Sequence, residues 1–97
     1  MSTAVDNVPP DPRMQYLQTH VQAEFRPLQL EIRDDGARHA GHAHAGRGHY
    51  SMRIVAAAFA GKDRLQRHRM IYAALGDLQQ ADIHALSIQA LAPDESH

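Results

Sequence analysis

Apolar residues recur at spacings of three and four in two segments of the chain, and this period predicts two amphipathic helices. The first covers residues 14–25, and its apolar face consists of Met14, Leu17, Val21 and Phe25. The second covers residues 63–78, where the carboxylate of Asp63 can cap the first turn. The apolar face predicted for it consists of Leu65, Ile71, Tyr72, Leu75 and Leu78. Prolines 9, 10 and 12 exclude a helix interior, so residues 1–12 are predicted to be a flexible lead-in.

Period-2 alternation and strand-forming residues predict three strands, over residues 28–33, 50–59 and 83–91. Residues 34–48 hold all but two of the six glycines, fit neither period and are predicted to form a long loop. The first two strands are then antiparallel across this loop, and a right-handed crossover through the second helix makes the third strand parallel to the second. The order α-β-β-α-β predicts an α/β (α+β) fold with a three-stranded mixed sheet and both helices on one face.

This topology predicts where the histidines lie. Eight of the 97 residues are histidine, and four of these fall between positions 39 and 49. The second strand runs away from the loop, so a parallel third strand must start at the edge of the sheet where the loop ends. We therefore expect His84, at the start of the third strand, to lie beside the loop that carries His39, His42 and His44.

Length and composition limit the classes of protein to consider. A chain of 97 residues fits one domain, predicted over residues 13–93 with a C-terminal tail over 94–97. Without cysteine, the chain alone can form neither a disulfide nor a thiolate metal site. The longest nearly apolar stretch, residues 54–60, is far shorter than the roughly 20 residues that span a bilayer. The acidic start lacks the pattern of a secretory signal, so we expect a cytoplasmic protein, with an organelle as the alternative.

Three motifs of the chain resemble those of the BolA family: Phe59-Ala60-Gly61, Arg67-His68-Arg69-Met70-Ile71-Tyr72 and Ile83-His84-Ala85-Leu86-Ser87-Ile88. Segments 34–39 and 49–50 extend the likeness over nearly all of residues 28–93. The resemblance implies a class II KH-like fold, which agrees with the order of elements predicted from periodicity. It also implies a heterodimer with a monothiol glutaredoxin, in which the glutaredoxin cysteine, a glutathione thiol and histidine of the BolA-like partner hold a [2Fe–2S] cluster.

The resemblance also implies which histidines are ligands. The family's histidine in the third-strand motif matches His84, and its second, variable ligand in the loop matches His39. The loop here is rich in Gly, Ala and His, unlike the usual pattern, so His42 or His44 could take the place of His39. Judged without the family, a lone histidine such as His84 is more often structural or solvent-facing, and His-rich loops can be merely solvated or bind adventitious metal.

Other polar residues have structural as well as functional interpretations. His68 falls within the apolar face of the second helix and is predicted to pack against the sheet, while His49 is predicted to help pack or orient the hairpin. One basic cluster could contact phosphates or an acidic partner surface, or could be solvated charge: Lys62, Arg64, Arg67 and Arg69. Because Arg67 and Arg69 lie about 160° apart on a helical wheel, they form no single basic stripe.

Several function classes lack support in the sequence. The net charge is −1 and no two glycines are three residues apart, which disfavours RNA binding through a GxxG loop. We find no cysteine nucleophile, G-x-S-x-G elbow or phosphate-binding glycine loop, and therefore predict that the chain is not an enzyme. A cluster-sharing adaptor for iron–sulfur trafficking or iron sensing is the main prediction. A nucleic-acid-binding transcriptional regulator that uses the second helix, with DNA as a possible partner, is the alternative. A cluster-free interaction module also stays open, as does self-association as a homodimer.

Overall fold

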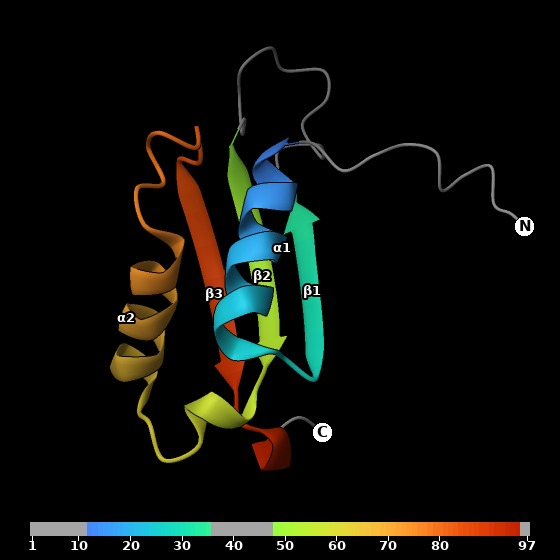
Figure 1. Cartoon of the computed structure of the whole chain (residues 1–97), viewed down its shortest axis with the longest axis vertical. Helices are drawn as coiled ribbons and strands as arrows, with labels where there is room; N and C mark the ends of the chain where they lie inside the picture. The colour runs from blue at the N-terminus through green and yellow to red at the C-terminus, as the bar shows by residue number, and fades with distance from the viewer. Residues whose placement is uncertain (1–11, 36–47, 96–97) are drawn as a thin grey trace, which may run out of the picture.

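The computed structural model describes residues 12–35 and 48–95 of the 97-residue chain, and these follow the predicted order of elements (Figure 1). The elements are α1 (Pro12–Phe25), β1 (Gln29–Asp34), β2 (His49–Val55), the 3₁₀ turn η3 (Ala57–Phe59), α2 (Arg64–Leu75), β3 (Ala85–Leu91) and the 3₁₀ turn η4 (Pro93–Glu95). The strand order is β1-β2-β3, with β1 antiparallel and β3 parallel to β2. The predicted mixed sheet is confirmed.

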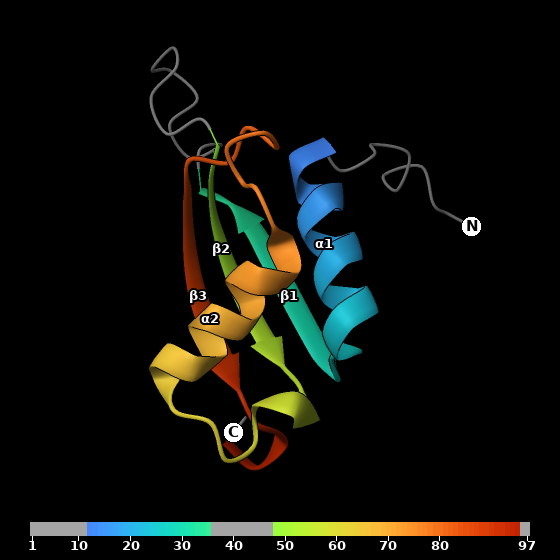
Figure 2. The same ribbon diagram turned by 60° about the vertical axis from the view of Figure 1, so that its left-hand side comes forward.

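Both helices cover the same face of the sheet, as Figures 1 and 2 show from two directions. The core between the layers consists mainly of Tyr50, Met52 and Ile54 of β2, Leu17 and Val21 of α1, and Ile71 and Leu75 of α2. Each of these side chains is at most 2% exposed. The apolar face predicted for the first helix is therefore confirmed, and so is the placement of both helices on one face. No helix in the described ranges is long and apolar enough to cross a membrane.

The second strand is shorter than predicted, because the chain leaves the sheet after Val55. Ala56 still donates a hydrogen bond to the Leu91 carbonyl over 3.0 Å, but the chain then turns through η3. This turn carries Phe59 into the core, where it is fully buried with its ring centroid 5.1 Å from that of Phe25. The prediction that Phe59 ends a strand is wrong. Phe59 is apolar because it packs in the core, and it reaches the core from a 3₁₀ turn.

Helix α2 begins where predicted and ends earlier. The Asp63 side chain accepts a hydrogen bond from the Gln66 N–H, and the Gln66 side chain accepts one from the Asp63 N–H, both over 2.8 Å. This reciprocal capping box fixes the first turn. Gly76 follows Leu75 with a φ of 72°, a left-handed conformation that suits glycine and ends the helix three residues before the predicted residue 78.

The apolar face predicted for the second helix is wrong at Leu65 and Tyr72, whose side chains are 57% and 42% exposed. Both lie on one flank of α2, about 100–120° around the helix from the buried Ile71. Arg67 lies within about 40° of Ile71 and completes the stripe that faces the sheet. His68 is half-buried beside this stripe, and its packing against the sheet stays a prediction.

The first and third strands begin later than predicted. Leu28 precedes β1 and is 70% exposed, although its N–H donates to the Val55 carbonyl over 2.8 Å. Ile83 and His84 precede β3, because Asp82 has a φ of 63° that turns the chain immediately before them. His84 therefore lies in the connection to the strand.

Candidate functional site

His84 lies where the connection between β1 and β2 meets the start of β3. The carbonyl of Gly48 accepts hydrogen bonds from the backbone N–H groups of His84 and Ala85, over 2.9 and 3.2 Å. The parallel register then pairs His49 with Ala85. These contacts confirm that the third strand starts beside the end of the predicted loop. The loop histidines themselves, His39, His42 and His44, lie outside the described residues.

Gly48 is close to His84 because it has no side chain. A Cβ at this position would lie 2.6 Å from Cδ2 of His84 and 2.9 Å from the carbonyl oxygen of Asp82. Gly48 also has a φ of 76°, which other residues rarely adopt. Glycine is thus required here both for the backbone conformation and for the approach of the histidine ring.

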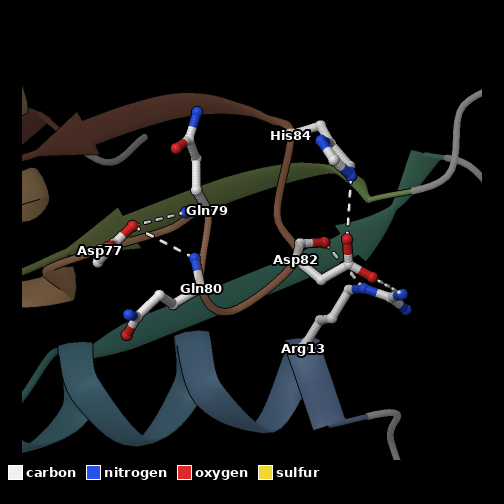
Figure 3. A network of polar contacts seen from close by, with 6 residues as sticks. All are labelled: Arg13, Asp77, Gln79, Gln80, Asp82 and His84. Atoms are coloured by element: carbon white, nitrogen blue, oxygen red, sulfur yellow. Dashed lines mark hydrogen bonds and ion pairs between the residues drawn. The ribbon is translucent and has the colours of Figure 1, made fainter.

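A carboxylate and a guanidinium continue the site from His84 to α1. Nε2 of His84 lies 3.0 Å from Oδ1 of Asp82. Oδ2 of the same carboxylate forms an ion pair with Arg13, and Nε of Arg13 donates to the backbone carbonyl of Asp82 over 2.9 Å. Figure 3 shows these three side chains as one line of contacts from the start of α1 to the turn before β3. The His84 side chain is 59% exposed, so the line ends at the surface.

The charges of this network favour an ionised carboxylate. The hydrogen bond and positive charge of Arg13 lower the pKa of Asp82 below its ordinary value, and the contact with His84 lowers it further. The hydrogen bond to Asp82 in turn raises the pKa of Arg13. At neutral pH the Asp82 carboxylate is therefore charged, and both of its oxygens act only as hydrogen-bond acceptors.

His84 is placed to give a metal one ligand at the surface of the domain. Within residues 12–35 and 48–95, no three His, Cys, Asp or Glu side chains form a group that could hold a metal ion. His49, the nearest described histidine in the strand register, is exposed at the start of β2. Since the whole chain lacks cysteine, any thiolate ligand to a metal at His84 must come from another molecule.

The predicted basic cluster does not act as one group. Arg67 forms a two-pronged ion pair with Glu95 of η4, with Nη1–Oε1 and Nη2–Oε2 distances of 2.7 and 3.0 Å. Its Nη1 also donates to the Ala90 carbonyl over 2.9 Å, and its side chain is only 11% exposed. Arg67 thus joins α2 to the chain after β3 and is not solvated charge. Lys62, Arg64 and Arg69 are exposed.

The ion pair of Arg67 predicts a loss of stability in acid. The hydrogen bonds that Glu95 accepts lower its pKa from 4.5 to about 2. The resulting stabilisation of the folded state is therefore complete above pH 4.5 and is lost as the pH falls toward 2. We expect Glu95→Gln to be less stable than wild type at neutral pH and to lose less stability across this interval. Urea unfolding at a series of pH values measures both effects. Glu24→Gln, at an exposed position of α1, is the control, and equal behaviour of the two variants would contradict the assignment.

Sequence reasoning missed three residues of the site: Arg13, Gly48 and Asp82. The spacing of Asp82 and His84, two residues apart before a strand, was a local signal for a carboxylate beside the histidine ring. Arg13 offered no such signal, because 69 positions separate it from Asp82 and only the packing of α1 brings them together. Gly48 was one glycine among several in a glycine-rich segment, and only the strand pairing distinguishes it.

Comparisons with known proteins agree with this fold and with the family resemblance of the sequence. The family described as BolA-like protein matches residues 21–95. SufE-like protein 1, chloroplastic/mitochondrial, of Arabidopsis thaliana is 42% identical over 82 residues, which cover 77% of this chain and 22% of that protein. The DNA-binding transcriptional regulator BolA of Haemophilus influenzae is 33% identical over 84 residues, which cover 84% of this chain and 78% of that protein.

A solved structure extends the likeness to three dimensions. The BolA domain of SufE1 from Arabidopsis thaliana has a TM-score of 0.76 at 38% identity and covers 90% of this chain and 99% of that domain. The chain therefore spans a whole BolA domain but only about a fifth of the plant protein that contains it. On the family match, the sequence identity and the shared structure together, this chain belongs to the BolA-like protein family.

Proposed function

We propose that the chain is a non-enzymatic adaptor that forms a heterodimer with a monothiol glutaredoxin and shares a [2Fe–2S] cluster with it, for cluster trafficking or iron sensing. The position of His84 carries this proposal. A ligand shared between two proteins has to be accessible and yet fixed in direction. His84 is 59% exposed, while its backbone is bound to Gly48 and its ring contacts Asp82.

The donor atoms of the chain fit part of such a cluster. Neutral imidazole is a good ligand for iron, and clusters with mixed cysteine and histidine ligands have higher reduction potentials than plant-type all-cysteine clusters. In the proposal, the glutaredoxin cysteine and glutathione supply the thiolates, and this chain supplies His84. The second histidine is His39, with His42 and His44 as alternatives. When bound, the cluster supplies iron, sulfide and one-electron redox chemistry, while the chain holds the imidazole in position.

Replacing His84 tests the proposal directly. We expect wild-type protein, reconstituted anaerobically with a monothiol glutaredoxin, glutathione, iron and sulfide, to give a visible circular dichroism spectrum that differs from that of the glutaredoxin homodimer. His84→Ala should abolish this spectrum, because the imidazole that distinguishes the mixed cluster is missing. His20→Ala is the control, since that ring stacks on Tyr16 in α1, away from the site.

Gel filtration of the cluster-free proteins separates the remaining outcomes. A heterodimer that forms without a cluster and is unaffected by His84→Ala would favour a cluster-free interaction module. An unchanged cluster spectrum in His84→Ala would remove this residue from the ligands and contradict the proposal. The same experiment with His39→Ala, His42→Ala and His44→Ala identifies the second ligand by the change in the spectrum.

A DNA-binding regulator is the second candidate. It is favoured by three exposed basic residues, Lys62 before α2, Arg64 in its first turn and Arg69 in its middle, and by the relative from Haemophilus influenzae that bears this name. The net charge of −1 and the engagement of Arg67 by Glu95 weigh against it. DNA affinity that falls steeply with salt and with loss of Arg64 or Arg69 would favour this candidate over the adaptor.

A further inference from the structure

We propose that Asp82, anchored by Arg13, is a positioning residue that keeps a proton on Nε2 of His84 and thereby makes Nδ1 the metal-binding nitrogen. This inference rests on the proposed function, because it names the atom through which His84 would reach a shared cluster. It concerns Asp82 and Arg13, two residues outside the motifs that carry the family resemblance.

The first step of the argument is that Arg13 fixes Asp82 at two points. An arginine side chain carries only hydrogen-bond donors, so each of its contacts must end on an acceptor. Here Nη2 contacts Oδ2 of the carboxylate and Nε donates to the backbone carbonyl of the same residue, over 2.9 Å. The side chain of Arg13 is 21% exposed, which limits the directions it can take. Both the backbone and the side chain of Asp82 are thus held by α1.

The second step follows from the chemistry of a carboxylate. With Oδ2 engaged by Arg13, Oδ1 is the oxygen that faces His84, 3.0 Å from Nε2. An ionised carboxylate can only accept, so Nε2 has to be the donor in this contact. A neutral imidazole has one N–H, and a proton on Nε2 leaves the lone pair on Nδ1. Metal-binding histidines commonly donate their other N–H to a carboxylate in this way.

The third step concerns the orientation of the ring. Cδ2 and Nε2 are adjacent ring atoms; the first lies against Gly48 and the second against Asp82. The Cδ2–Nε2 edge therefore faces the protein, and Nδ1 belongs to the opposite side of the ring. Among the residues that the structure describes, Nδ1 has no hydrogen-bond partner. The nitrogen with the lone pair is the one left available to a ligand.

Asp82→Asn tests this inference with an isosteric change. The amide has one oxygen, which the donors of Arg13 should take, so the NH₂ group turns toward Nε2 of His84. The ring must then accept at Nε2 and carry its proton on Nδ1, which reverses the tautomer. Long-range ¹H–¹⁵N correlation spectra of the cluster-free protein, recorded at about pH 8, above the ordinary pKa of a histidine side chain, report this tautomer directly. Asparagine also tolerates the positive φ of 63° at this position.

Asp77→Asn is the matched control. Asp77 lies in the same connection between α2 and β3, where its carboxylate accepts from the N–H groups of Gln79 and Gln80 over 3.0 and 3.2 Å (Figure 3). The asparagine oxygen can keep both contacts, and this residue does not touch His84 in the network. We expect the wild type and Asp77→Asn to show the Nε2–H tautomer, and Asp82→Asn to show mainly Nδ1–H. The same tautomer in all three proteins would overturn the inference.

Cluster binding provides the second measurement and separates this inference from the proposed function. Loss of a partner that orients a ligand typically lowers metal affinity about 10- to 100-fold, so Asp82→Asn should lose its shared cluster to a chelator faster by a factor in that range. Asp77→Asn should match the wild type. If His84→Ala abolishes the cluster while Asp82→Asn retains it like the wild type, this inference fails and the proposed function stands. If the cluster survives His84→Ala, both fail.

Discussion

Phe59→Ala is expected to lower the free energy of unfolding by about 3–5 kcal/mol, the usual cost of removing a buried phenylalanine side chain. Phe59 is fully buried and its ring lies 5.1 Å from that of Phe25, so it joins η3 to the end of α1. Total stabilities of small domains are about 5–15 kcal/mol, so this single change removes a large share. Urea unfolding followed by far-UV circular dichroism measures the change.

Leu65→Ala is the control for this experiment. Leu65 is also a large apolar residue of the same region, but it is 57% exposed on α2. We expect its replacement to change the stability by about 0.5 kcal/mol or less, as for most surface positions. A loss at Leu65 comparable to that at Phe59 would mean that the described burial of the two side chains is wrong.

Gly48→Ala is expected to have two effects: it should destabilise the domain and displace His84. The left-handed backbone alone costs roughly 1–2 kcal/mol for a residue with a Cβ. At Gly48 the new Cβ would also lie 2.6 Å from the His84 ring and 2.9 Å from the Asp82 carbonyl oxygen. Overpacking of this kind adds about 1–3 kcal/mol, and the histidine has to move. Urea unfolding gives the energy, and chemical-shift changes of the His84 ring report the displacement.

Gly61→Ala separates the two causes. Gly61 has almost the same conformation, with a φ of 77°, but nothing lies within 4 Å of the Cβ that an alanine would bring. It should show the cost of the backbone conformation without the clash, and no change at the His84 ring. Equal losses in the two variants, with His84 undisturbed in both, would contradict the close approach of Gly48 to this histidine.

Much of the fold follows from periodicity, because burial acts on one side of each helix and strand. The apolar face of α1, the antiparallel and parallel strand pairs, and the meeting of the third strand with the loop end are confirmed. The spacing of apolar residues along a helix does not show how wide its buried face is. From the sequence alone, Leu65 and Tyr72 were therefore indistinguishable from Ile71. In the structure, Arg67 takes a place beside Ile71 on the side of α2 that faces the sheet, where it pairs with Glu95 and donates to the Ala90 carbonyl of β3.

The candidate site was predictable only in part, because some of its residues are far apart along the chain. His84 belongs to a recognisable motif, and the topology alone leads its backbone to the loop end. Asp82 contacts the ring from two positions away, but Arg13, which holds Asp82, lies 69 positions from it in sequence. Arg67 and Glu95 are similarly 28 positions apart. Periodicity describes the neighbourhood of each residue on its own element and carries no signal for such pairs.

The contacts of Arg13 also bear on where this domain begins. The family match starts at residue 21, in the middle of α1, and leaves out Leu17, which is fully buried. The hydroxyl of Tyr16 donates a hydrogen bond to the Leu75 carbonyl, and Arg13 forms an ion pair with Asp82. The first turns of α1 therefore hold both ends of the segment that connects α2 to His84. A fragment that begins at residue 21 would keep every motif that resembles the family but lose the contacts of Arg13 and Tyr16. For this protein the smallest unit worth expressing or grafting starts no later than Pro12.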